Sequence, residues 1–156
     1  MSNYERYSRY LVRSVDHIFK NFLSDSSIEE VFESQSDNED PIVSIELDGS
    51  LRGELVINLP LPTLDMLTKR IVPSVRKNSI KKHHPDVAGE IANLIAGTFV
   101  NQLQFVRHNV RPSAPEYNDD PLSIKALYEN INLSFSSRFG GFDVDLYFQE
   151  NPEEME

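Results

Sequence analysis

The spacing of apolar residues predicts two long helices and a short one. Large apolar side chains return every three or four positions over residues 8–23 and again over residues 86–107, which is typical of amphipathic helices with one buried face. A shorter apolar pattern follows two prolines, and Thr63 is expected to cap this third helix. Pro73 is expected to end or bend it, because proline cannot donate the next helical hydrogen bond.

Two other stretches alternate between apolar and polar residues, which predicts strands with one buried face. The first spans residues 42–59 around the turn dipeptide Asp48-Gly49, and the second spans residues 131–148 around Gly140-Gly141. Both are predicted to be β-hairpins. A helix, a hairpin, helices and then strands, in that order, favour an α+β fold. Its form would be a two-layer α/β sandwich on a mostly antiparallel sheet rather than a doubly wound parallel one.

Composition narrows the class of protein. A chain of 156 residues suits one domain, which we place at residues 1–150, with an acidic tail at residues 151–156. The absence of cysteine excludes a disulfide scaffold, a thiolate nucleophile and a cysteine-based zinc site. No segment approaches the roughly 20 apolar residues of a membrane helix. The polar N-terminus does not resemble a signal peptide, so we expect a cytoplasmic protein with no membrane partner.

The charge is strongly acidic and unevenly distributed. A net charge of −10 repels a phosphate backbone, so no nucleic-acid partner is expected. Residues 25–40 hold seven acids and residues 140–156 hold six, both without a base, while the rest of the chain holds 12 acids and 15 bases. Such runs are usually solvated, mobile surface, and electrostatic steering is the rarer role. We therefore interpret residues 25–40 as an acidic loop.

The helix predicted over residues 86–107 carries a polar stripe. At 100° per residue, six residues without a large apolar side chain fall within a sector about 80° wide. They are Asp86, Glu90, Asn93, Gly97, Asn101 and Gln104. An ordinary solvated face is one explanation. However, the stripe contains no Lys or Arg to pair with its acids. It also contains Gly97, which costs roughly 1 kcal/mol relative to Ala in a helix but permits close approach of another surface.

This stripe resembles a family signature. The segment from Asp86 through Glu90 to Asn93 is similar to the Asp/Ser-x-x-x-Glu-x-x-Asn motif of the CheC/CheX/FliY phosphatases, and the following Leu-Ile-Ala-Gly97 resembles its usual continuation. The segments 49–59 and 142–148 resemble the family's glycine-containing hairpin and closing strand. The resemblance therefore spans nearly the whole chain and is CheX-like. It is looser in the acidic stretch and between Pro112 and Tyr128.

The resemblance implies a specific fold and activity. Such proteins remove the phosphoryl group from the aspartate of a receiver domain, typically CheY, in bacterial chemotaxis. Their two long helices lie across an antiparallel sheet in pseudo-symmetric halves, and CheX-type members form homodimers by joining sheet edges. The resemblance implies no cofactor bound by this chain and a divalent metal, Mg²⁺, in the receiver. The first helix lacks a Glu-x-x-Asn sequence, so we expect one active site per chain.

Within this activity Glu90 and Asn93 are the expected catalytic residues. An acyl phosphate is already reactive, so the enzyme needs only to orient a water in line with phosphorus. The Asn93 amide can accept a hydrogen bond from that water and donate one to a phosphoryl oxygen. Glu90 would pair with the receiver's lysine, and general-base catalysis by Glu90 is the alternative. Asp86, Gly97 and Asn101 are assigned to partner binding, although for Asp86 we favour a helix N-cap.

Other features have ordinary explanations. His83 and His84 adjoin Asp86, but such a pair in a basic loop is usually solvent-exposed, and no metal site is assigned. Six bases could contact an acidic receiver surface, and a solvated linker over residues 76–85 is the commoner role; they are Lys69, Arg70, Arg76, Lys77, Lys81 and Lys82. Two further hypotheses for the protein remain: a non-catalytic receiver-binding protein, and a homodimeric interaction protein whose stripe has no ligand.

Overall fold

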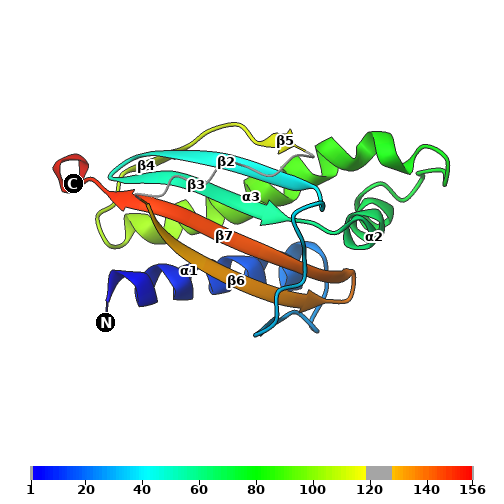
Figure 1. Ribbon diagram of the computed structural model, residues 1–156, viewed down its shortest axis with the longest axis horizontal. Coiled ribbons are helices and arrows are strands. Elements are labelled where there is room, and N and C mark those ends of the chain that lie inside the picture. The colour runs from blue at the N-terminus through cyan, green and yellow to red at the C-terminus, as the bar shows by residue number, and fades with distance from the viewer. Residues whose placement is uncertain (1, 119–127, 156) are drawn as a thin grey trace.

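A sheet forms one layer of the molecule and two long helices form the other, as Figure 1 shows in the computed structural model. The structure describes residues 2–118 and 128–155. Within them the strands are β1 (Glu29–Val31), β2 (Ile42–Gly49), β3 (Leu51–Asn58), β4 (Val110–Pro112), β5 (Glu116–Asn118), β6 (Glu129–Ser137) and β7 (Gly140–Glu150). The helices are α1 (Asn3–His17) with its π-helical continuation η1 (Ile18–Phe22), α2 (Leu61–Ile71), α3 (His84–Gln104), and the 3₁₀ turns η2 (Ile80–His83) and η3 (Pro152–Glu154). The predicted two-layer α+β sandwich is confirmed.

The same succession of elements occurs twice along the chain. α1 is followed by the short strand β1 and the β2–β3 hairpin, and α3 is followed by the short strands β4 and β5 and the β6–β7 hairpin. The two hairpins meet where β3 pairs antiparallel with β7. Each short strand extends the hairpin of the other half, since β1 pairs with β6 while β4 and β5 pair with β2. The halves are therefore pseudo-symmetric, with α2 inserted between them.

The core lies between the sheet and the pair α1 and α3 (Figure 1). Phe142 of β7 stacks on Phe19 of η1 and on Phe135 of β6, with ring centroids 4.9 and 5.4 Å apart. The buried face of α3 includes three alanines one turn apart, which allow its backbone to approach its neighbours closely. They are Ala88, Ala92 and Ala96. Burial of this face leaves the polar stripe of α3 on the outward side. No helix among the described residues is long and apolar enough to span a bilayer.

The long helices begin earlier than the apolar pattern predicted. α1 starts at Asn3, because Ser2 acts as its N-cap and accepts a hydrogen bond from the Glu5 backbone at 3.2 Å. α3 starts at His84 and ends at Gln104, and shortly afterwards Arg107 adopts a left-handed φ of 68°. Polar first turns carry no apolar periodicity, so the pattern could not reveal these starts.

Two sequence predictions are wrong: the capping role of Thr63 and the position of the turn at Gly140-Gly141. α2 begins at Leu61, which places Thr63 inside the helix, where its hydroxyl donates to the Gly141 carbonyl at 2.7 Å. Thr63 therefore fastens α2 to the sheet instead of capping the helix. In the second hairpin Ser137 pairs with Gly140, so the turn consists of the two residues between them and Gly140-Gly141 begins β7. Gly140 is needed there because its φ is 130°.

The acidic stretch 25–40 is attached to the sheet at several points. Asp25 is buried and accepts hydrogen bonds from Ser27 and from the Arg138 backbone. β1 lies within the stretch and pairs with β6. Most of the other carboxylates in it are exposed, so the interpretation as solvated surface holds for those side chains but not for Asp25 or the backbone.

A buried hydrogen-bond chain joins α1 to the segment after α3. The Asn109 N–H donates to Ser50 Oγ, which lies 2.8 Å from His108 Nδ1, and His108 Nε2 lies 2.8 Å from the Tyr7 hydroxyl. Tyr7 in turn donates to Glu150 at 3.2 Å. A consistent donor direction along this chain places the His108 proton on Nε2. Burial lowers the pKa of His108, in accord with a neutral imidazole that holds the two layers together.

Candidate functional site

The polar stripe of α3 is open to solvent along its length. Five of its side chains are exposed, and Gly97 is half-buried. The exposed five are Asp86, Glu90, Asn93, Asn101 and Gln104. The structure thus brings the predicted site residues onto one accessible surface of one rigid element.

Glu90 and Asn93 are adjacent on this surface and free of internal partners. They lie three residues apart on α3, a rise of about 4.5 Å. Within the described part of the chain, neither side chain forms a hydrogen bond or an ion pair. By contrast, Gln102 on the flank of α3 donates to Ser14 and to the Tyr10 carbonyl of α1. The Asn93 amide therefore keeps both its acceptor and its donors available to an external ligand.

The two glycines of α3 have different surroundings. A Cβ on Gly89 would lie 3.2 Å from Pro115 Cγ, so packing inside the molecule favours glycine there. A Cβ on Gly97 would meet nothing within 4 Å. No contact with the described residues requires glycine at position 97, and the space above it is available to an approaching surface.

The preferred capping role of Asp86 is wrong. α3 begins two residues earlier, its N-cap is His83, and no side chain forms a capping hydrogen bond. Asp86 lies in the first helical turn with its carboxylate exposed. A carboxylate there interacts favourably with the helix dipole and stands at the edge of the stripe.

The two histidines before the stripe differ from the expected exposed pair. His84 is buried, 3% exposed, and its Nε2 lies 2.8 Å from Asp65 Oδ1 of α2. This contact fixes the start of α3 against α2. His83 is half-buried. In residues 2–118 and 128–155, no three His, Cys, Asp or Glu side chains are grouped so that they could hold a metal ion.

On α1, the polar residues make contacts within the protein. Ser14 is buried and donates to the Tyr10 carbonyl at 2.7 Å. Asp16 pairs with Lys20 at 3.1 Å, and the Asn21 amide bonds to His17 one turn earlier. The free carboxylate and amide of α3 therefore have no counterpart at these positions of α1.

The segment that precedes the stripe is helical, which the sequence pattern does not predict. The sequence predicts a linker over residues 76–85, but Lys81 and Lys82 lie in η2, which passes into α3 without a non-helical residue between them. A run of bases has no apolar periodicity, so no local signal marked this segment as helical. The stripe is consequently preceded by exposed cations on a continuous helical path.

Comparisons with known proteins identify the fold. No family model matches the chain, and no curated protein is similar to it in sequence. Among solved structures, CheX from Vibrio vulnificus superposes with a TM-score of 0.77 at 18% identity, covering 96% of this chain and 100% of that one. CheX from Desulfovibrio desulfuricans gives 0.77 at 14% identity, over 92% and 99% of the two chains. A chain of the CheX–CheY–BeF₃–Mg²⁺ complex from Borrelia burgdorferi gives 0.76 at 17% identity, over 92% and 98%. The chain has the CheX fold.

Proposed function

We propose that this protein is a phosphatase that hydrolyses the aspartyl phosphate of a CheY-like receiver domain. The observation that carries the proposal is the exposed, unpartnered pair Glu90 and Asn93 on the outward face of α3. The chain has the fold of CheX proteins, and one such structure is a complex with CheY, BeF₃ and Mg²⁺. That complex supports a receiver domain as the partner of this chain.

Asn93 is proposed to position the attacking water. Its side-chain oxygen accepts a hydrogen bond from the water, and its NH₂ group donates to a phosphoryl oxygen. The water oxygen bonds to phosphorus as the bond to the aspartate oxygen breaks. The aspartate leaves as a carboxylate, and inorganic phosphate carries the water's protons. Fixing the water in line removes part of the entropic barrier, because the attack becomes effectively intramolecular.

Glu90 is proposed to set the docking register. A carboxylate one helical turn before Asn93 can form a charge-assisted hydrogen bond with a lysine beside the receiver's phosphoryl group. Such a pair fixes the rotation and height of α3 relative to the phosphorus. The divalent metal belongs to the receiver in this proposal, and this chain supplies positioning only.

The proposal is tested by following loss of the phosphoryl group from a CheY-type receiver that has been phosphorylated with acetyl phosphate. Wild-type protein should accelerate the loss. Asn93→Ala should reduce that acceleration by roughly 100-fold or more, the usual effect of removing one positioned side-chain amide. The control is Asn38→Ala, which removes an exposed asparagine from a loop remote from α3 in sequence.

Two results would contradict the proposal. If Asn93→Ala matched the wild-type rate, Asn93 would not position the water. If the wild-type protein bound the receiver without shortening the lifetime of its phosphoryl group, the protein would be a non-catalytic receiver-binding protein.

A homodimer joined through sheet edges is also proposed. β1 pairs only with Ser134–Ser136 of β6. Among the described residues no strand lies beside the outer edge of β6 from Glu129 to Leu133. At the other side of the sheet, the edge of β2 is paired with the short strands β4 and β5. A partly uncovered edge is suited to pairing with a second copy of the chain.

A further inference from the structure

We propose that the basic surface connecting α2 to α3 is a second docking surface, which binds carboxylates on the receiver at a distance from its phosphoryl group. The basic surface is formed by Lys69, Arg70, Arg76, Lys77, Lys81 and Lys82. This inference rests on the proposed function and adds how the partner is recognised and oriented.

The basic surface is positively charged, whereas the protein as a whole is acidic. Between Asp65 and Asp86 the sequence contains six Lys and Arg residues and no acid, in a chain whose net charge is −10. All six side chains are exposed. A concentrated positive region on a negative molecule orients an approaching partner, because it is the region that attracts acidic groups.

Internal contacts do not explain these cations. Among the described residues, Lys20 pairs with Asp16, Arg52 and Arg111 pair with Asp48, and the His84 ring contacts the Asp65 carboxylate. None of these contacts uses a residue of the basic surface. Arg70 makes a long hydrogen bond of 3.5 Å to the Leu23 carbonyl. In the described part of the chain, the basic surface is thus without acidic partners.

Lys81 and Lys82 also stand where helix electrostatics disfavours them. Both precede the N-terminus of α3, the positive end of the dipole of a 21-residue helix. The side chain of the N-cap residue, His83, forms no capping hydrogen bond there. Cations at such a position lower the stability of the helix slightly, so their contribution is better sought in binding than in folding.

The α3 end of the basic surface, Lys81 and Lys82, has a fixed position relative to Asn93. η2 runs into α3, and the contact between His84 and Asp65 holds this junction against α2. Lys82 precedes Asn93 by eleven residues of helical backbone, a rise of about 16 Å. A protein interface of ordinary size covers roughly 800 Å² on each partner, which corresponds to a disc with a radius of about 16 Å. Lys82 therefore lies at the rim of a footprint centred on Asn93, and the rest of the basic surface extends from there toward α2.

The order of charges from the basic surface to Gly97 indicates which charges a complementary partner must carry. The basic surface comes first, the carboxylates Asp86 and Glu90 follow, and the neutral residues Asn93 and Gly97 come last. A complementary receiver has a cation beside its phosphoryl group and carboxylates about one interface radius away. Charges at the rim of an interface act mainly on the association rate and on its salt dependence.

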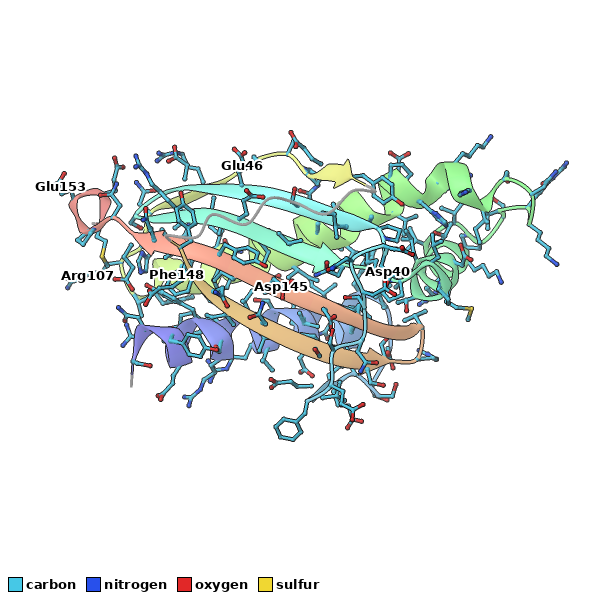
Figure 2. The ribbon with its side chains drawn as sticks, in the orientation of Figure 1. Asp40, Glu46, Arg107, Asp145, Phe148 and Glu153 are labelled. Atoms are coloured by element: carbon cyan, nitrogen blue, oxygen red, sulfur yellow. The ribbon has the colours of Figure 1, made fainter. Side chains whose placement is uncertain are left out.

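The test compares two variants with the same change in charge. The first is Lys77→Gln/Lys81→Gln/Lys82→Gln in the basic surface. The control is Arg52→Gln/Arg107→Gln/Arg111→Gln, and Figure 2 shows Arg107 at the end of the molecule opposite α2. For each protein, kcat/KM and kcat for dephosphorylation of the CheY-type receiver are measured at about 50 mM and about 500 mM salt, where screening is weak and strong respectively.

The basic-surface variant should lose about 10-fold in kcat/KM at low salt with kcat unchanged, and the loss should shrink at high salt. The control should change by less than about 2-fold. Equal kcat/KM values for the two variants at low salt would overturn the inference.

A binding measurement separates this inference from the proposed function. If the wild-type protein fails to accelerate dephosphorylation, the proposed function fails. Binding of the beryllofluoride-loaded receiver to the three proteins then tests the basic surface alone. Weaker binding by the basic-surface variant supports the docking surface, and equal binding by all three overturns it.

Discussion

At the scale of single residues, Gly97 distinguishes the requirements of helix stability from those of partner binding. Glycine in a helix interior is unfavourable because its backbone loses the most conformational freedom on folding. At Gly89 the close approach of Pro115 explains the glycine, but the open space beyond Gly97 does not. The choice of glycine at position 97 is therefore consistent with a partner that must approach α3 closely.

This contrast gives a prediction for both glycines. Gly97→Ala should raise the free energy of unfolding by about 1 kcal/mol through helix propensity. Gly97→Leu should give a similar gain but lower kcat/KM for the phosphorylated receiver by at least roughly 10-fold, because a side chain now occupies the contact surface. Urea denaturation and the dephosphorylation assay measure the two effects. Gly89→Ala is the control and should gain less stability, because its Cβ would crowd Pro115. Full activity of Gly97→Leu would show that the partner does not contact this position.

At the scale of elements, one carboxylate holds the acidic stretch to the sheet. Asp143 of β7 is buried and accepts hydrogen bonds from the side chains of Ser34 and Ser36 and from the backbone of Gln35 and Ser36. Burial alone would raise the pKa of Asp143, but these hydrogen bonds outweigh it and lower the pKa below its ordinary value. The folded structure therefore stabilises the ionised form of Asp143.

Replacing this carboxylate should weaken the attachment of the stretch. We expect Asp143→Asn to lower the free energy of unfolding at pH 7 by about 2 kcal/mol, the scale of hydrogen bonds to a buried charge. Because the folded-state pKa is lowered, this stabilisation is complete above the unfolded value of 3.8 and is lost as pH falls through the folded-state pKa. The difference between variant and wild type should therefore shrink in acid, as measured by urea titrations from pH 7 to pH 3.

The matched control for Asp143 is Glu33→Gln, which neutralises an exposed carboxylate in the same stretch and should change stability by less than about 0.5 kcal/mol. If the difference in the free energy of unfolding between Asp143→Asn and wild type did not depend on pH, the charge of Asp143 would not be what holds the acidic stretch to the sheet.

At the scale of the whole molecule, the part of the β6 edge that no described strand covers offers a route to assembly. Ser137 and Gly140 close the two-residue hairpin, and hydrogen-bonded and open pairs alternate from there along β6 and β7. Asn130 falls opposite Tyr147 in an open pair. Its backbone N–H then points away from β7, toward the strand that a second copy would supply.

Asn130→Pro should accordingly give a folded monomer. Proline removes an N–H that β7 does not use, so the sheet within one chain should survive while pairing across the dimer is blocked. Light scattering at micromolar concentration measures the change, and circular dichroism checks the fold. Asn130→Ala keeps the N–H and should stay dimeric. A dimer of Asn130→Pro, or a monomeric wild type, would rule out assembly through this edge.

The sequence by itself determined the features that depend on local periodicity. Apolar spacing revealed the two long helices and the two hairpins, because burial of one face imposes the same spacing wherever it occurs. The same periodicity placed Glu90, Asn93 and Gly97 on one stripe, and the structure confirms that this stripe faces outward. Their proposed roles remain predictions.

The tertiary structure alone decided which polar groups meet. His84 pairs with Asp65 across 19 residues of sequence, Ser36 reaches Asp143 across 107, and Tyr7 reaches His108 across 101. Such contacts leave no trace in local spacing, because chain folding rather than helix or strand geometry brings the partners together. The bases before α3 resemble a linker in the sequence for another reason, because a run of bases has no apolar periodicity. Only the continuous path from η2 into α3 placed them beside the candidate site.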